Sequence, residues 1–84
     1  MVKPSKLYAL LVKSTDRSVS FRDFERLLKA FGFVHDRTTG SHRHYVHAKV
    51  PFSFPVQPDR KDAKRYQIRQ FLGIVREYEL SIEE

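Results

Sequence analysis

Four histidines lie close together in the middle of the chain, between positions 35 and 47. Three of them fall in one segment, GSHRHYVH, whose residue types alternate as in a β-strand. On a strand, His42 and His44 project from one face, while Arg43, Tyr45 and His47 project from the other. Imidazole titrates near neutral pH, so a histidine here is suited to general acid or base catalysis.

Two other interpretations of these histidines stay open. His42 and His44 are spaced i, i+2 and could bind a metal ion, but the chain has no cysteine and this strand has no acidic residue. We therefore expect no metal and no other cofactor. The remaining alternative is an exposed strand whose histidines only add polarity to the surface.

The distribution of charge indicates a polyanionic partner. The chain has 16 Lys and Arg against 10 Asp and Glu, a net charge of +6. Four of the acids lie in the last eight residues, so the first 76 residues carry a net charge of +10. Such a density on a small domain is typical of nucleic-acid binding, although solubility alone can also explain it.

Length and composition limit the architecture. With 84 residues, we expect one domain spanning 1–84 and one compact core. The absence of cysteine excludes disulfides and thiolate zinc sites and fits a reducing cytosol. The longest apolar run near the N-terminus, residues 7–12, is too short for a signal peptide or a membrane span. We expect a cytoplasmic, soluble protein.

Two helices are predicted in the first third of the chain. Leucines on one face indicate a short amphipathic helix over residues 5–14. Ser20 is a natural N-cap for a second helix, with Asp23 in its first turn, and Gly32 ends that helix in a left-handed conformation. The second helix has a core-facing stripe of five residues: Phe21, Phe24, Leu27, Leu28 and Phe31.

Strands follow, and then a last helix. We predict strands over residues 33–37, 42–48 and about 52–57, with 38–41 as a hairpin loop and 58–62 as a polar turn. Pro51 and Pro55 confine the third strand to a sheet edge or to a short ladder. The last helix has its own apolar stripe: Ile68, Phe71, Leu72, Val75 and Tyr78. The order α-α-β-β-β-α predicts an α+β fold with a three-stranded antiparallel sheet and helices on one face.

Several of these motifs together resemble the HicA/YcfA family of mRNA interferase toxins. The first half contributes Gly32-Phe33-Val34 and the stretch GSHRxYxH that begins at Gly40. The second half contributes VQPDR and AKxYQIRQFL, which are similar to the strand–turn–helix segment of one branch of the family. The union of the two halves is more specific than the short Gly-Ser-His motif by itself.

The resemblance implies a double-stranded-RNA-binding-domain-like α-β-β-β-α core over residues 20–80, preceded here by an extra short helix. It also implies an endoribonuclease that cleaves mRNA independently of the ribosome, arrests translation and is neutralised by a HicB-type antitoxin. The lack of cysteine and of an acid–histidine cluster predicts that this cleavage is metal-independent. The family's catalytic histidine corresponds to His42, directly after Gly40 and Ser41. The alternative is a non-catalytic RNA-binding or protein-interaction module on the same fold.

Eight residues are predicted to bind RNA, in two groups. Basic residues around the start of the last helix favour phosphate, because the helix dipole adds to their charge. A solvated charged face is the alternative for each of them, and a tight turn is the alternative for Gly40. Tyr45 either packs inward or stands beside the RNA. The predicted RNA-binding residues are Gly40, Ser41 and Arg43 near His42, and Arg60, Lys61, Lys64, Arg65 and Arg69 near the helix.

Overall fold

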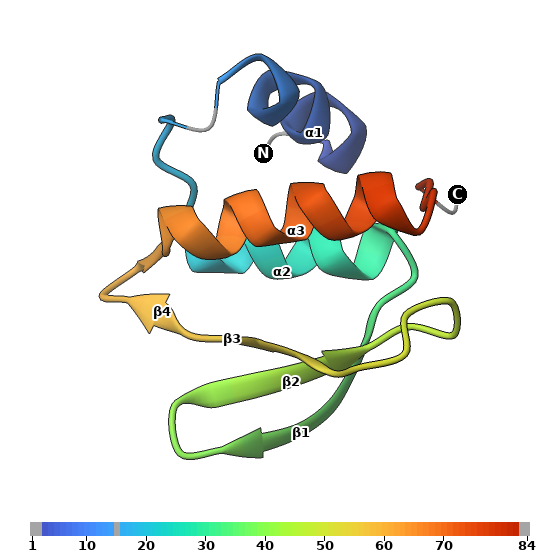
Figure 1. Cartoon of the computed structure of the whole chain (residues 1–84). Helices are drawn as coiled ribbons and strands as arrows, with labels where there is room; N and C mark the ends of the chain where they lie inside the picture. The colour runs from blue at the N-terminus through green and yellow to red at the C-terminus, as the bar shows by residue number, and fades with distance from the viewer. Residues whose placement is uncertain (1–2, 15, 83–84) are drawn as a thin grey trace.

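A computed structural model describes residues 3–14 and 16–82 and confirms the predicted α+β fold (Figure 1). Three helices accompany a three-stranded antiparallel sheet with strand order β1-β2-β3 and a separate two-stranded hairpin. After the first helix, the order of the main elements is that of a double-stranded-RNA-binding-domain-like fold. The elements are α1 (Pro4–Lys13), α2 (Phe21–Ala30), β1 (Val34–Thr39), β2 (His42–Val46), β3 (Phe54–Val56), β4 (Pro58–Asp59), β5 (Asp62–Ala63) and α3 (Arg65–Glu77).

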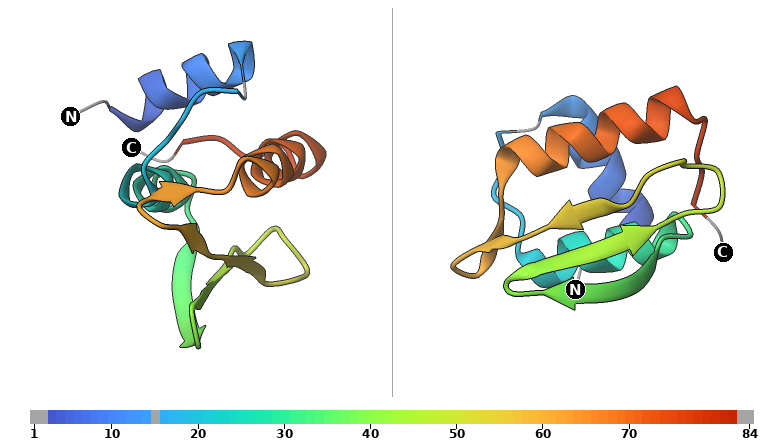
Figure 2. Two further views of the ribbon diagram at one scale, coloured as in Figure 1. Left: turned by 90° about the vertical axis from the view of Figure 1, so that its left-hand side faces the viewer. Right: turned by 60° about the horizontal axis from the view of Figure 1, so that its bottom comes forward.

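The elements form layers, with every helix on the same side of the sheet. Figures 1 and 2 show α2 and α3 side by side over one face of the sheet, and α1 on the far side of these two helices. No element within residues 3–14 and 16–82 covers the opposite face of the sheet (Figures 1 and 2). One hydrophobic cluster joins the layers, and its largest fully buried side chains include Tyr45, Phe24, Phe31 and Phe71. No helix in residues 3–14 or 16–82 is long and apolar enough to cross a membrane.

The boundaries of α2 follow the predicted local chemistry. The Ser20 hydroxyl accepts a hydrogen bond from the backbone N–H of Asp23 at 3.1 Å, which satisfies one of the free donors of the first turn. Gly32 ends the helix with a φ of 93°, a conformation that glycine adopts without a steric penalty. All five residues of the predicted core-facing stripe are buried.

The β1–β2 hairpin is longer and tighter than predicted. The predicted loop 38–41 is wrong in its first half, because Thr38 and Thr39 belong to β1 and only Gly40 and Ser41 form the turn. The pair Thr39↔His42 closes the ladder directly at this turn. β-branched threonines favour extended backbone, and Gly40, with a φ of 61°, allows the reversal in two residues.

The other strands are shorter than predicted. β2 ends at Val46 instead of residue 48, because the backbone N–H of Val50 donates to the His47 carbonyl and closes a turn. β3 keeps only three residues, and it lies at the sheet edge as predicted from Pro55. The predicted polar turn at 58–62 is in fact a small hairpin, β4–β5, which turns at Arg60 and Lys61.

The last helix packs the predicted stripe into the core, where Phe71 lies against Phe24 and Phe31 of the α2 region. Ile68, Phe71 and Val75 are buried, and Leu72 and Tyr78 pack against the core while partly exposed. The helix begins at Arg65, directly after β5, so the small hairpin leads the chain from the sheet edge to the first turn of α3.

Candidate functional site

The four histidines differ in their surroundings, and His42 is the exposed one whose ring is free of hydrogen bonds to the described residues. His47 is held at both ring nitrogens: Nδ1 accepts from the Lys49 N–H, so Nε2 carries the proton and donates to the Phe31 carbonyl, each at 3.0 Å. His35 Nε2 lies 2.8 Å from the Thr38 hydroxyl. His42 is exposed and has no hydrogen-bond partner within the described residues.

His42 and His44 lie on the uncovered face of the sheet. Their neighbours Arg43 and Tyr45 contact helix α2, so the alternate positions of β2 point away from the helices, as the strand pattern predicted. His44 is half-buried between Arg37 of β1 and Pro55 of β3. Its buried Nδ1 finds no hydrogen-bond partner in the part of the chain that the structure describes. His42 is therefore the ring of this pair that solvent and a substrate reach more freely.

A third protein ligand for a metal at this pair is missing from the described segments. Over residues 3–14 and 16–82, no three side chains of His, Cys, Asp or Glu come together in a group that could hold an ion. A histidine pair by itself supplies two donors, whereas structural and catalytic zinc sites use three or four protein ligands.

Glu25 of α2 forms hydrogen bonds to the two residues of β2 that face the helices. One carboxylate oxygen accepts from Arg43 Nη1 and the other from the Tyr45 hydroxyl, both at 2.6 Å. Tyr45 thus packs inward, with none of its surface exposed. Burial first, and the bond to Glu25 second, raise the pKa of Tyr45 well above its ordinary value. The carboxylate joins α2 to the residues immediately after His42.

Arg43 is directed to the helix side of the sheet. Its hydrogen bond to Glu25 raises its pKa, and its guanidinium lies 5.3 Å from the centre of the Phe21 ring. The side chain is still 45% exposed, so it can reach solvent at the rim of the sheet. RNA contact by Arg43, Gly40 and Ser41 stays a prediction. Gly40 and Ser41 are exposed at the turn next to His42.

The predicted basic cluster gathers at the same end of the molecule as His42. Arg60 and Lys61 form the β4–β5 turn, and Lys64, Arg65 and Arg69 lie at or near the start of α3. None of these five forms an ion pair with an acidic residue that the structure describes. Figures 1 and 2 show the β1–β2 turn, the β4–β5 hairpin and the first turn of α3 at one end of the fold.

Gln67, which the sequence analysis did not single out, connects the strand end near His42 to the start of α3. Arg43 pairs with Val56 in the ladder, so His42 lies beside the position of Gln57. The backbone N–H of Gln57 donates to Gln67 Oε1 at 3.1 Å, and Gln67 is buried in the first turn of α3. The bond joins the strand end beside His42 to the basic start of the helix.

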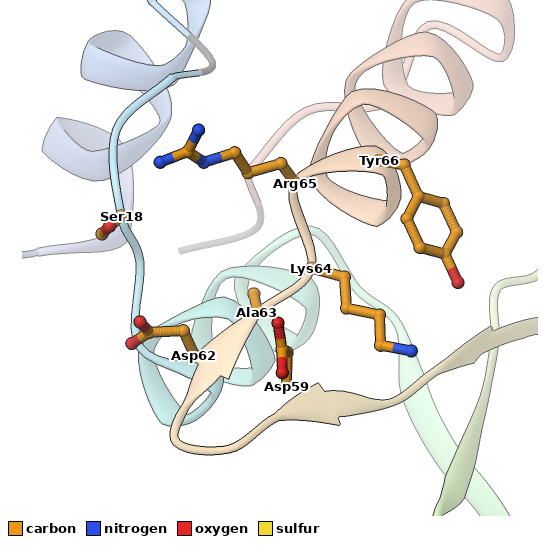
Figure 3. Close-up of a pocket in the computed structure, with 7 residues that line it drawn as sticks. All are labelled: Ser18, Asp59, Asp62, Ala63, Lys64, Arg65 and Tyr66. Atoms are coloured by element: carbon orange, nitrogen blue, oxygen red, sulfur yellow. The ribbon is translucent and has the colours of Figure 1, made fainter.

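Glu25 and Tyr66 were also missed, and the sequence contains a partial signal for these two residues and for Gln67. Glu25 and Gln67 are polar residues at the margin of an apolar helical stripe, a pattern typical of buried hydrogen bonds between elements. Tyr66 is 52% exposed and lines a pocket of about 480 Å³ together with Lys64 and Arg65 (Figure 3). Tyr66 lies on the side of the helix opposite the apolar stripe, a position that predicts exposure.

The comparison with protein families places these features in a known group. The family model described as the HicA toxin of bacterial toxin–antitoxin matches residues 21–75, nearly two thirds of the chain. The chain belongs to the HicA toxin family. The matched region of this HicA toxin runs from α2 into α3 and includes His42 and the whole basic cluster, while α1 lies outside it. The comparisons with curated proteins and with solved structures give no match. As a HicA toxin, the protein is the toxin of a toxin–antitoxin pair, in a family that generally acts by ribonuclease activity.

Proposed function

We propose that this HicA toxin is an endoribonuclease that cleaves mRNA, with His42 as its general acid or base. The observation that carries the proposal is the position of His42, exposed on the open sheet face at the same end of the fold as five cations without acidic partners among the described residues (Figures 1 and 2). His44 and His47 are half-buried, and the exposed His35 is hydrogen-bonded to Thr38, so His42 alone among the four combines exposure with a ring free of hydrogen bonds to the described residues.

The chemistry needs little beyond these groups, because RNA contains its own nucleophile. His42 takes the proton of a ribose 2′-hydroxyl, and the oxygen attacks the adjacent phosphorus in line with the leaving 5′-oxygen. The bond from phosphorus to the 5′-oxygen breaks, and that oxygen receives a proton from water or from a protonated histidine. The products are a 2′,3′-cyclic phosphate end and a free 5′-hydroxyl, and nearby cations stabilise the charge on the phosphoryl oxygens.

The decisive experiment incubates the purified chain with a long RNA. Wild type should cleave it and leave cyclic phosphate ends, and His42→Ala should abolish both cleavage and growth arrest. His35→Ala is the matched control, because it removes another exposed histidine of the same hairpin and should keep the activity. Undiminished cleavage by His42→Ala would disprove the role of His42, and RNA binding without cleavage by wild type would favour a binding module.

The same assay tests the metal interpretation. Because we propose proton transfer by a histidine, cleavage should continue in EDTA. Activity that is lost with the chelator and restored by zinc or manganese would assign His42 and His44 to a metal site instead.

For the partner, we propose an acidic HicB-type antitoxin that covers His42. A toxin of 84 residues has little surface to spare, so a neutralising protein most simply occludes the site and the cations around it. Opposite charges at such an interface speed association and make it sensitive to salt.

A further inference from the structure

We propose that Tyr66 is a stacking platform for an unpaired base of single-stranded RNA, and that Lys64 and Arg65 hold the adjacent phosphates. The inference rests on the proposed ribonuclease function and deepens it, because it names the form of RNA that the pocket at the start of α3 accepts. Its basis is the exposure of one tyrosine, the cation above its ring and the shape of the surrounding pocket.

Tyr66 differs from the other tyrosines in that it is neither buried nor packed against another aromatic ring of the described residues. Tyr45 is fully buried and bonded to a carboxylate, and Tyr8 and Tyr78 pack edge-on against phenylalanine rings. Tyr66 is 52% exposed and contacts no other aromatic ring within the described residues. Its ring is thus available to a ligand without any loss of core packing.

The Lys64 ammonium lies over the face of the Tyr66 ring, which shows that this face is open to a cation or another ligand. Its Nζ lies 5.9 Å from the ring centroid, within the range of a cation–π interaction. At an exposed site this attraction is weak, so a nucleobase can replace the ammonium on the ring. The displaced Lys64 then reaches the phosphate of the same nucleotide, which combines stacking with charge as in other single-strand binding sites.

The pocket has room for a nucleotide and is lined by charges of both signs. Its volume is about 480 Å³. Figure 3 shows Arg65 reaching toward Ser18, Tyr66 on the opposite side of the helix start, and Lys64 extending toward the β4–β5 hairpin. Asp59 and Asp62 come from that hairpin, and their carboxylates repel phosphate. A phosphate in this pocket is therefore favoured beside Lys64 or Arg65 and disfavoured beside the two aspartates.

Single-stranded RNA is the class of ligand that fits these features. Stacking on a side chain requires a base whose face is free, and in a duplex both faces are covered by neighbouring pairs. Tyr66 precedes Gln67, whose bond to Gln57 joins the helix start to the strand end beside His42. A base held on Tyr66 would thus set which phosphodiester of a single strand passes His42.

Binding of a short fluorescent RNA tests the proposal directly. The RNA has 2′-O-methyl sugars, so it cannot be cleaved, and it is offered as a single strand and as a duplex. Tyr66→Ala should weaken binding of the single strand by roughly 5- to 150-fold, the value of one stacked base, and should change duplex binding by less than about twofold. Tyr66→Phe keeps the ring and should bind like wild type, and the Tm of both variants should match that of wild type.

Salt dependence separates stacking from charge. Tyr66→Ala should leave the slope of log Kd against log salt unchanged, whereas Lys64→Gln should reduce that slope by about 0.7. Equal losses for the single strand and the duplex, equal losses for Tyr66→Phe and Tyr66→Ala, or no loss at all would each overturn the stacking role.

The outcome is independent of the proposed catalysis. Selective loss of single-strand binding in a protein that cleaves no RNA would support the Tyr66 site and refute the nuclease. Cleavage that depends on His42, with single-strand binding unaffected by Tyr66→Ala, would refute the Tyr66 site and support the nuclease.

Discussion

The two hydrogen bonds to Glu25 have the same length, but they should contribute unequally to stability. Tyr45 is fully buried and the Glu25 side chain is 13% exposed, so their bond is shielded from water. A hydrogen bond to a charged group in such surroundings contributes about 1.5–3 kcal/mol. The Arg43 side chain is 45% exposed, and ion pairs of that kind contribute about 0.2–1 kcal/mol.

Tyr45→Phe and Arg43→Gln separate these two bonds. Tyr45→Phe removes only the hydroxyl and should lower the free energy of unfolding by about 1.5–3 kcal/mol, or the Tm by about 6–24 °C for a domain of this size. Arg43→Gln should lower the free energy by at most about 1 kcal/mol. Urea unfolding measures both values, and a double-mutant cycle with Glu25→Gln isolates the coupling of Tyr45 to Glu25.

Two results would refute this reasoning. If Arg43→Gln costs as much as Tyr45→Phe, the exposed ion pair is as strong as the shielded bond, and exposure is not what sets the difference. If Tyr45→Phe changes stability by less than about 0.5 kcal/mol, the hydroxyl is bonded equally well to water in the unfolded chain. In the second case the bond from Tyr45 to Glu25 would not be a main attachment of β2 to α2.

Three further predictions concern pH, backbone strain and the partner. The pKa of Tyr45 is raised above its ordinary value of 10.0, so the stability that its protonated form contributes is complete below about pH 10 and is lost above it. Above pH 10 the free energy of unfolding should therefore fall more steeply in wild type than in Tyr45→Phe, by about 1.4 kcal/mol per pH unit, and parallel plots of this free energy against pH would contradict the prediction. Arg60 has a φ of 61°, a conformation that glycine adopts without steric penalty. Arg60→Gly should therefore leave the free energy of unfolding in urea unchanged or raise it by up to about 1 kcal/mol, and it should weaken RNA binding. A loss of more than about 1 kcal/mol would show that the turn needs the arginine side chain. Charge reversal at Lys64 and Arg65 should weaken binding of both RNA and an acidic antitoxin. In the complex with the antitoxin, hydrogen-exchange protection confined to α1, with His42 open to RNA, would argue against occlusion of the site.

Features that depend on neighbours within one or two turns of chain were predictable from the sequence. The cap at Ser20, the helix end at Gly32 and the buried stripes follow from local hydrogen bonds and from the helical repeat. The alternation of β2, which puts His42 and His44 opposite Arg43 and Tyr45, follows from the two-residue period of a strand. Strand ends were predicted less well, because a single turn hydrogen bond such as that of His47 moves them by two residues.

Which side chains share a site depends on how the whole chain packs. Glu25 meets Tyr45 from 20 positions away, and Gln67 meets Gln57 from 10 positions away, so no local pattern contains either pair. The choice of His42 over the other histidines was suggested by a family resemblance, while its accessibility follows from how β1, β3 and α2 surround its neighbours. The physical reason is that periodicity assigns a residue to a face, whereas burial and hydrogen bonding depend on what the packed chain brings against that face.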